Sequence, residues 1–163
     1  MNENILNSSK APEPVGLYPH ARRVGNLLFL SGVGPRERGT KVIPGVELND
    51  AGEIVAYDIE TQCRSVFQNV RYILEDAGSA WENVVDVTVF LTNMRDDFAT
   101  FNRLYAEHFA DCRPLALPFR VGVQRRSGPV AGGTTGVPGR ARSPRAAANR
   151  WRAQACAGVA VRN

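Results

Sequence analysis

Apolar residues recur at helical spacing over residues 59–77, and this is the clearest periodic pattern in the chain. The apolar positions are Ile59, Cys63, Val66, Phe67, Val70, Ile73, Leu74 and Ala77. Asp58 precedes them, where its carboxylate can accept hydrogen bonds from the free N–H groups of a first helical turn. Gly78 follows them, which is typical of the residue just after a helix. The pattern predicts an amphipathic helix that lays one face on a sheet.

Three other segments carry strand patterns. Residues 27–31 form an apolar run between Gly25 and Gly32, which predicts a buried strand. Residues 46–48 and 53–55 alternate around the turn-forming segment 49–52, which predicts a hairpin. Residues 84–91 also alternate and predict a longer strand. One face of that strand would carry Val85, Val87, Val89 and Leu91, and the other Val84, Asp86, Thr88 and Phe90.

A second helix is predicted after this strand, with Asp96 or Asp97 as its N-cap. Its apolar face consists of Phe98, Phe101, Leu104, Tyr105 and Phe109. The order strand, hairpin, helix, strand, helix is that of an α+β domain. Beyond it only residues 119–124 have weak strand character, and no counterpart of a further strand is evident.

Charge divides the chain near residue 111. Residues 1–111 hold 10 basic and 16 acidic residues, a net charge of −6, whereas residues 112–163 hold 10 arginines and no acidic residue. Of those last 52 residues, 32 are Ala, Arg, Gly or Pro, whose codons can consist of G and C alone. Two interpretations follow: a shifted reading frame or replaced end, and a genuine disordered basic tail. We therefore separate a domain over 11–124 from a tail over 125–163.

Several classes of site and location are disfavoured. The chain has no H-E-x-x-H, P-loop, G-x-G-x-x-G or G-x-S-x-G motif, and it has only two histidines. Its three cysteines are widely spaced, which suggests neither disulfides nor a metal site, and Cys63 lies on the apolar stripe of the first helix. No stretch approaches the length of a membrane span, and the polar N-terminus does not look like a secretory signal. We expect a cytoplasmic protein.

One ordered set of motifs resembles the Rid (YjgF-type) family of imine and enamine deaminases over roughly residues 11–111. The motifs are Gly16-Leu17-Tyr18-Pro19-His20-Ala21-Arg22-Arg23-Val24-Gly25, Leu27-Leu28-Phe29-Leu30-Ser31-Gly32, Thr88-Val89-Phe90-Leu91-Thr92-Asn93-Met94 and Asp97-Phe98-Ala99-Thr100-Phe101-Asn102. The first looks most like the 2-aminomuconate deaminase branch. The resemblance implies a Rid/chorismate-mutase-like sheet packed on two helices and a homotrimer with active sites at its interfaces. It also implies two more strands after the second helix, and from this sequence we expect them to be altered or missing.

The resemblance also implies site residues, carried over one position at a time. Tyr18, Ser31 and Asn102 match residues that line the family's pocket and are the implied catalytic residues. The family's carboxylate-binding arginine would fall near Ala116, so Arg120 in Pro118-Phe119-Arg120 becomes the implied substrate-binding residue. Arg22 is the candidate for a second carboxylate. Each also has an ordinary structural interpretation: a half-buried tyrosine, a serine ending a strand, an exposed helical asparagine and solvated arginines.

The implied activity is cofactor-free and metal-free hydrolysis of an enamine or imine acid. For the branch resembled, 2-aminomuconate would give 4-oxalocrotonate and ammonia in aromatic catabolism, with a small carboxylate as substrate and no membrane partner. The alternatives are a general deaminase of 2-aminoacrylate-type imines and a non-catalytic trimer that binds a ligand. A nucleic-acid-binding role of the arginine-rich tail is a further alternative, disfavoured because stacking aromatics and known binding motifs are few.

Overall fold

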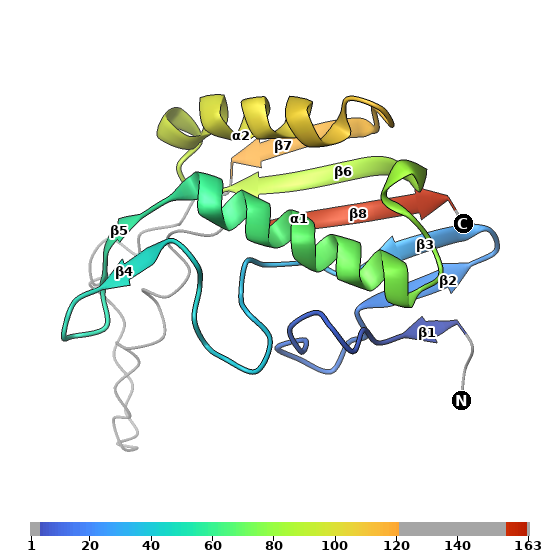
Figure 1. Ribbon diagram of the computed structural model, residues 1–163, viewed down its shortest axis with the longest axis horizontal. Helices are drawn as coiled ribbons and strands as arrows, with labels where there is room; N and C mark the ends of the chain where they lie inside the picture. The colour runs from blue at the N-terminus through green and yellow to red at the C-terminus, as the bar shows by residue number, and fades with distance from the viewer. Residues whose placement is uncertain (1–3, 121–155, 163) are drawn as a thin grey trace, which may run out of the picture.

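A six-stranded sheet with two helices on one face forms the frame of the molecule (Figure 1). The computed structural model describes residues 4–120 and 156–162, and for residues 117–120 and 156–162 the description is that of the backbone. The elements are β1 (Ile5–Leu6), β2 (Ala21–Val24), β3 (Leu27–Leu30), β4 (Val46–Leu48), β5 (Ile54–Tyr57), α1 (Ile59–Asp76), a 3-10 turn (Trp81–Asn83), β6 (Val84–Leu91), α2 (Met94–Phe109), β7 (Leu115–Arg120) and β8 (Cys156–Arg162). The strand order is β1-β2-β3-β8-β6-β7, with β4 and β5 as a separate hairpin. The predicted α+β class is confirmed.

Helix α1 forms as its sequence predicts. Asp58 is the N-cap, and its carboxylate accepts from the backbone N–H groups of Glu60 and Thr61. Gly78 follows the helix with φ of +73°, a left-handed conformation that glycine adopts without strain. The apolar stripe lies on the sheet, and Cys63 is buried within it as a core residue.

Helix α2 begins differently from the prediction. Asn93 is its N-cap, because the N–H groups of Asp96 and Asp97 both donate to the Asn93 carbonyl, and the helix runs from Met94. Neither aspartate caps the helix. Asp96 accepts from the Asn93 side chain, whereas Asp97 lies inward, buried against Tyr57.

A register shift in β6 changes which of its residues face the core. The alternation predicts Val85 inward, but the pairing of β6 with β8 is irregular between Val84 and Asp86. Val84 is therefore buried together with Val87, Val89 and Leu91, and Val85 is exposed. A bulge adds one residue to one strand and so reverses the alternation on one side of it.

The last strand of the sheet comes from the end of the tail, where the sequence indicated no counterpart. Strand β8 pairs antiparallel with β3 on one side and β6 on the other, placing Val161 opposite Leu28 and Val159 opposite Val87. Without it, β3 and β6 would each leave a row of backbone groups unpaired inside the sheet. The two strands that the resemblance implies after α2 are therefore present as β7 and β8, and β8 is formed by residues 156–162. Of the tail predicted over 125–163, residues 125–155 and 163 lie outside the described residues.

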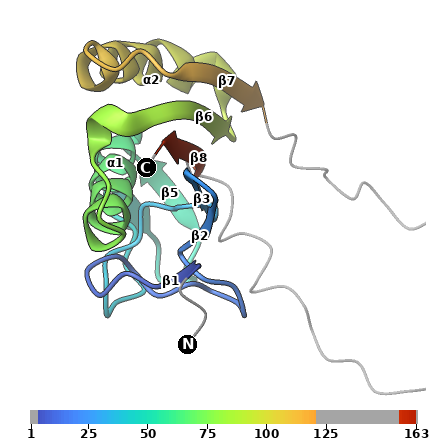
Figure 2. The ribbon, with the colours of Figure 1, turned by 90° about the vertical axis from the view of Figure 1, so that its right-hand side faces the viewer.

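Both helices cover the same face of the sheet, and the opposite face is open among the described residues (Figure 2). Under the helices the core includes an aromatic cluster, in which Phe67 contacts Trp81 and Phe109 edge-on and Trp81 stacks on Phe109. On the open face β2 and β3 expose Val24 and Phe29. An apolar sheet face left open in this way is a candidate contact surface.

Arg113, just beyond α2, carries backbone strain. It has φ of +42° and is the one non-glycine residue with a positive φ in the described part of the chain. We expect Arg113→Gly to raise the free energy of unfolding by about 1 kcal/mol, since glycine relieves the left-handed penalty. Urea unfolding measures this. Arg113→Ala, which keeps the Cβ atom and loses the bond from Nε to the Ala110 carbonyl, should bring no gain; an equal gain would contradict the assignment to strain.

Candidate functional site

Ser31 is hydrogen-bonded to Pro19, the residue that follows Tyr18. The Ser31 hydroxyl donates to the Pro19 carbonyl at 2.7 Å, and the Ser31 N–H donates to the His20 carbonyl at 2.9 Å. Tyr18 is 42% exposed at the tip of the connection between β1 and β2. The hydroxyl proton of Ser31 is therefore committed to the loop that carries Tyr18, while its oxygen can still accept a hydrogen bond. The structure brings these two predicted residues together.

Ser31 and Arg120 lie at the same edge of the sheet. Strand β7 is parallel to β6, and both β3 and β6 are antiparallel to β8, so the C-terminal ends of β3, β6 and β7 share this edge. Ser31 follows β3, and Arg120 ends β7 opposite Leu91. Three strand spacings of about 4.8 Å separate β3 from β7, roughly 14 Å across the sheet. The backbone of Arg120 therefore lies at the same edge of the sheet as Ser31, but not beside it. The side chain of Arg120 is outside the described part of the structure.

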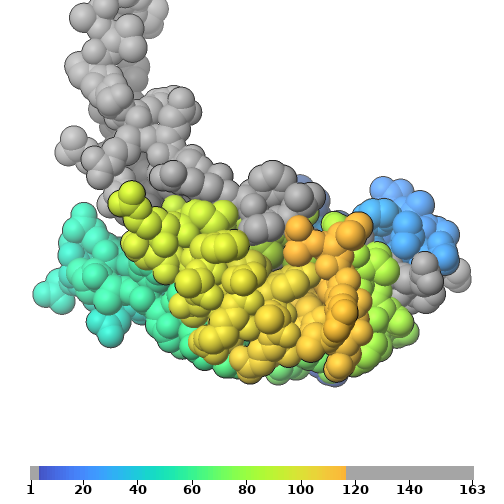
Figure 3. Space-filling model, turned by 90° about the horizontal axis from the view of Figure 1, so that it is seen from above, coloured from blue at the N-terminus to red at the C-terminus, as the bar shows by residue number. Residues whose placement is uncertain are grey.

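Asn102 lies away from this junction, whereas Arg22 is two residues from His20, whose carbonyl binds the Ser31 N–H. Asn102 is exposed on α2, and no hydrogen bond of its side chain is formed within the part of the chain that the structure describes. Helix α2 lies at the molecular surface with the β4–β5 hairpin standing out near its N-terminal end (Figure 3). Arg22 is exposed on β2, opposite Phe29. Within a single chain, Asn102 on α2 and the backbone of Arg120 on β7 are therefore separated from the neighbouring Tyr18, Ser31 and Arg22.

A buried polar cluster that the sequence did not reveal lies where β5, α1 and α2 meet. Asp97 is only 4% exposed, and its carboxylate accepts from the Tyr57 hydroxyl at 3.2 Å. The Asn93 amide donates to the same hydroxyl at 2.9 Å. Burial raises the pKa of Asp97, and the neighbouring Asp96 raises it further, while the Tyr57 hydrogen bond opposes them. Because Tyr57 and Asp97 lie 40 residues apart in the sequence, no local motif indicates the pair.

Asp97→Asn is expected to stabilise the protein at neutral pH. Since the pKa of Asp97 is raised in the fold, the folded protein binds a proton more tightly than the unfolded chain, and the charged carboxylate opposes folding at pH 7. Asparagine keeps an oxygen for Tyr57 without the charge. The advantage should be complete above the raised pKa and vanish as pH falls to 3.8, the ordinary value.

Thermal unfolding of both proteins between pH 7 and pH 3.8 tests this prediction. Asp50→Asn is the control, because Asp50 is exposed in the β4–β5 turn and does not contribute to the shifted pKa of Asp97. The assignment of a raised pKa to Asp97 would be contradicted if the difference in unfolding temperature between Asp97→Asn and the natural chain grew as the pH fell.

Two other buried groups lie on α1. Burial raises the pKa of the Cys63 thiol to about 12, with Asp97, Asp58 and Glu60 adding to the effect. The thiol therefore stays protonated and unreactive at neutral pH. Gln62 is fully buried, and neither polar atom of its amide has a hydrogen-bond partner among the described residues. Its position inside an apolar stripe gave no sign of this in the sequence.

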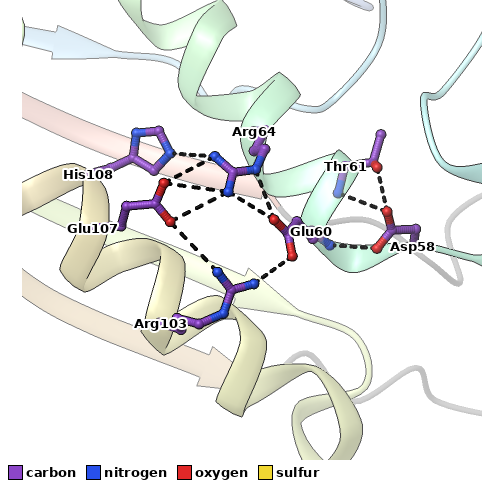
Figure 4. Close-up of polar contacts among 7 residues, drawn as sticks. All are labelled: Asp58, Glu60, Thr61, Arg64, Arg103, Glu107 and His108. Atoms are coloured by element: carbon purple, nitrogen blue, oxygen red, sulfur yellow. Dashed lines mark hydrogen bonds and ion pairs between the residues drawn. The ribbon is translucent and has the colours of Figure 1, made fainter.

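Charged groups between the outer surfaces of α1 and α2 are paired with one another (Figure 4). Glu60 bridges Arg64 at 2.8 Å and Arg103 at 2.5 Å, and Glu107 lies 3.4 Å from Arg64. Arg64 and Arg103 are thereby engaged by carboxylates of the chain itself. This cluster is a poorer receptor for a substrate carboxylate than an uncommitted arginine would be. In the described ranges no three histidine, cysteine or acidic side chains gather as metal ligands.

The sequence matches a known family. The family model described as Endoribonuclease L-PSP matches residues 8–129, most of the chain. The chain belongs to this family. The Rid (YjgF-type) resemblance is thereby confirmed at the level of the family, while the 2-aminomuconate branch stays a prediction.

Individual relatives agree with this assignment. A RutC family protein of Pyrococcus abyssi is 36% identical over 121 residues, covering 74% of this chain and 86% of the relative. Reactive Intermediate Deaminase A, a chloroplastic protein of Arabidopsis thaliana, is 31% identical over 121 residues, covering 74% of this chain and 58% of the relative. The crystal structure of a Thermotoga maritima protein described as an endoribonuclease superposes with a TM-score of 0.65 at 28% identity, covering 98% of this chain and 96% of that one.

Location within the cell is not decided by family membership, since one family relative is chloroplastic by name. Among the helices formed by residues 4–120, none is long and apolar enough to cross a bilayer. The cytoplasmic location stays a prediction.

Proposed function

We propose that this chain is a cofactor-free hydrolytic deaminase of enamine and imine acids, and that 2-aminomuconate is its substrate. The observation that carries the proposal is membership of the Endoribonuclease L-PSP family, together with 31% identity to a protein named Reactive Intermediate Deaminase A. The finer assignment of substrate rests on the resemblance of residues 16–25 to the 2-aminomuconate branch. The junction of Tyr18 and Ser31 supports a site at the edge of the sheet.

The reaction needs little from the protein. The 2-enamine takes a proton on carbon and loses one from nitrogen, which gives the 2-imine, and water then adds to the C2=N bond. The C–N bond of the resulting carbinolamine breaks, so that ammonia leaves and the 2-oxo acid remains. In this proposal Arg120 holds the carboxylate, Tyr18 and Ser31 border the reacting carbon, Asn102 offers an amide, and Arg22 is the candidate for the second carboxylate. Orientation and donor groups of this kind suffice to accelerate such a reaction.

We further propose that the active protein is a homotrimer whose subunits complete each other's sites. Two observations support this. Asn102 and Arg120 lie apart from the other predicted residues within one chain, and the sheet face opposite the helices exposes Val24 and Phe29. Light scattering of the purified chain should give three times 17.8 kDa. A monomer at micromolar concentration would contradict the trimer.

Ammonia release is the experiment that tests the function. The chain is offered 2-aminomuconate or 2-aminoacrylate, each generated in situ, and release is measured above the spontaneous decay. Faster release from the six-carbon diacid supports the proposal. Preference for 2-aminoacrylate would favour the general imine-deaminase alternative, and tight binding of a 2-oxo acid without release would favour a non-catalytic binding protein.

Two observations favour a second candidate function, the binding of RNA. The matching family is described as an endoribonuclease, and residues 112–163 carry 10 arginines without an acidic residue. Binding through phosphates would weaken steeply with salt and be lost on deletion of residues 125–163. Salt-independent binding, or none, would exclude this candidate.

A further inference from the structure

The connection between β1 and β2 has an exposed tip on a firmly held base. At the tip Leu17 is fully exposed and Tyr18 is 42% exposed. At the base Ala11 and His20 are buried, His20 with only 7% of its surface exposed. An exposed aromatic side chain that acts on a substrate needs a fixed backbone, because ordering a mobile loop opposes binding.

His20 links the two sides of this loop. Its Nδ1 accepts from the Ser8 N–H at 2.9 Å, and its Nε2 lies 2.8 Å from the Pro12 carbonyl, to which it can only donate. The neutral imidazole with its proton on Nε2 satisfies both contacts at once. Ser8 and Pro12 precede the tip, whereas His20 follows Tyr18 by two residues. The ring therefore links the part of the loop that precedes its tip to the part that follows it.

Other contacts hold the same base from outside the loop. Arg38 donates to the Ala11 carbonyl at 2.6 Å and pairs with Glu13 at 2.8 Å, and Arg36 donates to the Glu13 carbonyl at 2.7 Å. On the outgoing side, Ser31 holds the Pro19 carbonyl. These contacts fix each side separately. Two side chains bridge from one side to the other: the His20 ring, with its two contacts, and Asn7, whose Oδ1 accepts from the His20 N–H at 3.4 Å.

The Ser8 hydroxyl extends the arrangement to α1. It accepts from the Ala11 N–H at 2.9 Å and donates to the Asp76 carboxylate at 2.8 Å, near the end of the helix. The Ser9 N–H donates to the same carboxylate at 2.7 Å. Through Ser8, the ring of His20 is thus coupled to a rigid helix rather than to another loop.

We propose that His20 is a positioning residue that fixes the loop carrying Tyr18 relative to the sheet edge. This rests on the proposed function for its catalytic consequence. His20 does not touch substrate; it acts by holding the backbone on either side of Tyr18. Loss of the ring should let the tip move by an ångström or more, which can lower turnover about 100-fold.

A double-mutant cycle with Tyr18 separates positioning from a general structural role. His20→Ala is expected to lower kcat/KM for ammonia release about 10- to 100-fold in the natural chain but less than about twofold in a Tyr18→Ala background. His20→Gln, whose amide can donate to Pro12, should recover part of the loss. Equal losses in both backgrounds, or no loss in the natural chain, would overturn the proposal.

Val70→Ala serves as the control for stability. Val70 is buried in α1 and its side chain has no hydrogen-bonding group, so its truncation destabilises the fold without removing a hydrogen bond of the loop. At a temperature where both variants remain folded, Val70→Ala should keep the kcat/KM of the natural chain. A loss like that of His20→Ala would assign the effect to stability and overturn the proposal.

Hydrogen exchange of the full-length protein provides a readout that does not depend on turnover. In His20→Ala, a peptide covering residues 8–20 should exchange about tenfold faster, while peptides of α2 keep their rates. Val70→Ala should not produce this local pattern. If the natural chain releases no ammonia, the proposed function fails, yet faster local exchange still supports the fixed loop. Unchanged exchange of residues 8–20 in His20→Ala overturns it.

Discussion

Arg120→Ala is expected to abolish measurable ammonia release from an enamine diacid while leaving the unfolding temperature unchanged. Arg120 ends β7 at the sheet edge shared with Ser31, and the family resemblance makes it the replacement for a carboxylate-binding arginine that would fall near Ala116. Loss of both hydrogen bonds to a carboxylate removes about 3 kcal/mol or more of binding. That corresponds to at least about a 100-fold loss in kcat/KM.

Two further variants sharpen this test. Arg120→Lys keeps the charge but loses the planar fork, so we expect an intermediate loss. Arg125→Ala removes one charge from the basic tail, at a position outside the described residues, and should leave kcat/KM unchanged. Similar losses in Arg120→Ala and Arg125→Ala, diminishing with salt, would indicate general attraction of an anion. Full activity of Arg120→Ala would remove Arg120 from the site.

Local rules in the sequence predicted the elements whose determinants lie close together in the chain. Helix α1 is one: its cap at Asp58, its apolar period and its stop at Gly78 lie within 21 residues, and all three are found. The β4–β5 hairpin is another, since the turn over 49–52 fixes the pairing of its own neighbours. The boundaries of such elements are set by residues close in sequence, and these local signals agree with the fold.

The prediction failed where distant segments decide the structure. Asp97 turns inward because Tyr57 meets it from another element, so a residue expected as a cap became a buried acid. Val84 replaces Val85 in the core because of a bulge against β8, a partner more than 70 residues away. Strand β8 itself has a composition dominated by small residues, and only the unfilled position between β3 and β6 explains its pairing.

The candidate site was predictable only in part, for the same reason. The resemblance named Tyr18 and Ser31, and the structure joins them through Pro19. The role of His20 follows from contacts with Ser8 and Pro12 that no spacing rule indicates. Asn102 stays apart from the junction, and a role for it at the same site would require the trimer proposed above.

Phe67→Ala is expected to be the most destabilising single substitution considered for this fold. Phe67 is 4% exposed and meets Trp81, His108 and Phe109, with ring centroids 5.9, 4.9 and 5.5 Å away. Because α1, α2 and the turn before β6 meet at this ring, little can collapse into the space it leaves. The expected loss in the free energy of unfolding is about 3–5 kcal/mol.

Urea unfolding, followed by circular dichroism, measures that loss, and Phe98→Ala is the matched control. Phe98 lies on the same helix as Phe109 but is 40% exposed, so its truncation should reduce the free energy of unfolding by less than about 1 kcal/mol. A much larger loss in the free energy of unfolding for Phe67→Ala than for Phe98→Ala would show that contacts between the helices contribute strongly to the stability of the domain. Equal losses would mean that the aromatic cluster contributes no more than surface contacts do, and that the sheet, closed by β8, stabilises the domain instead.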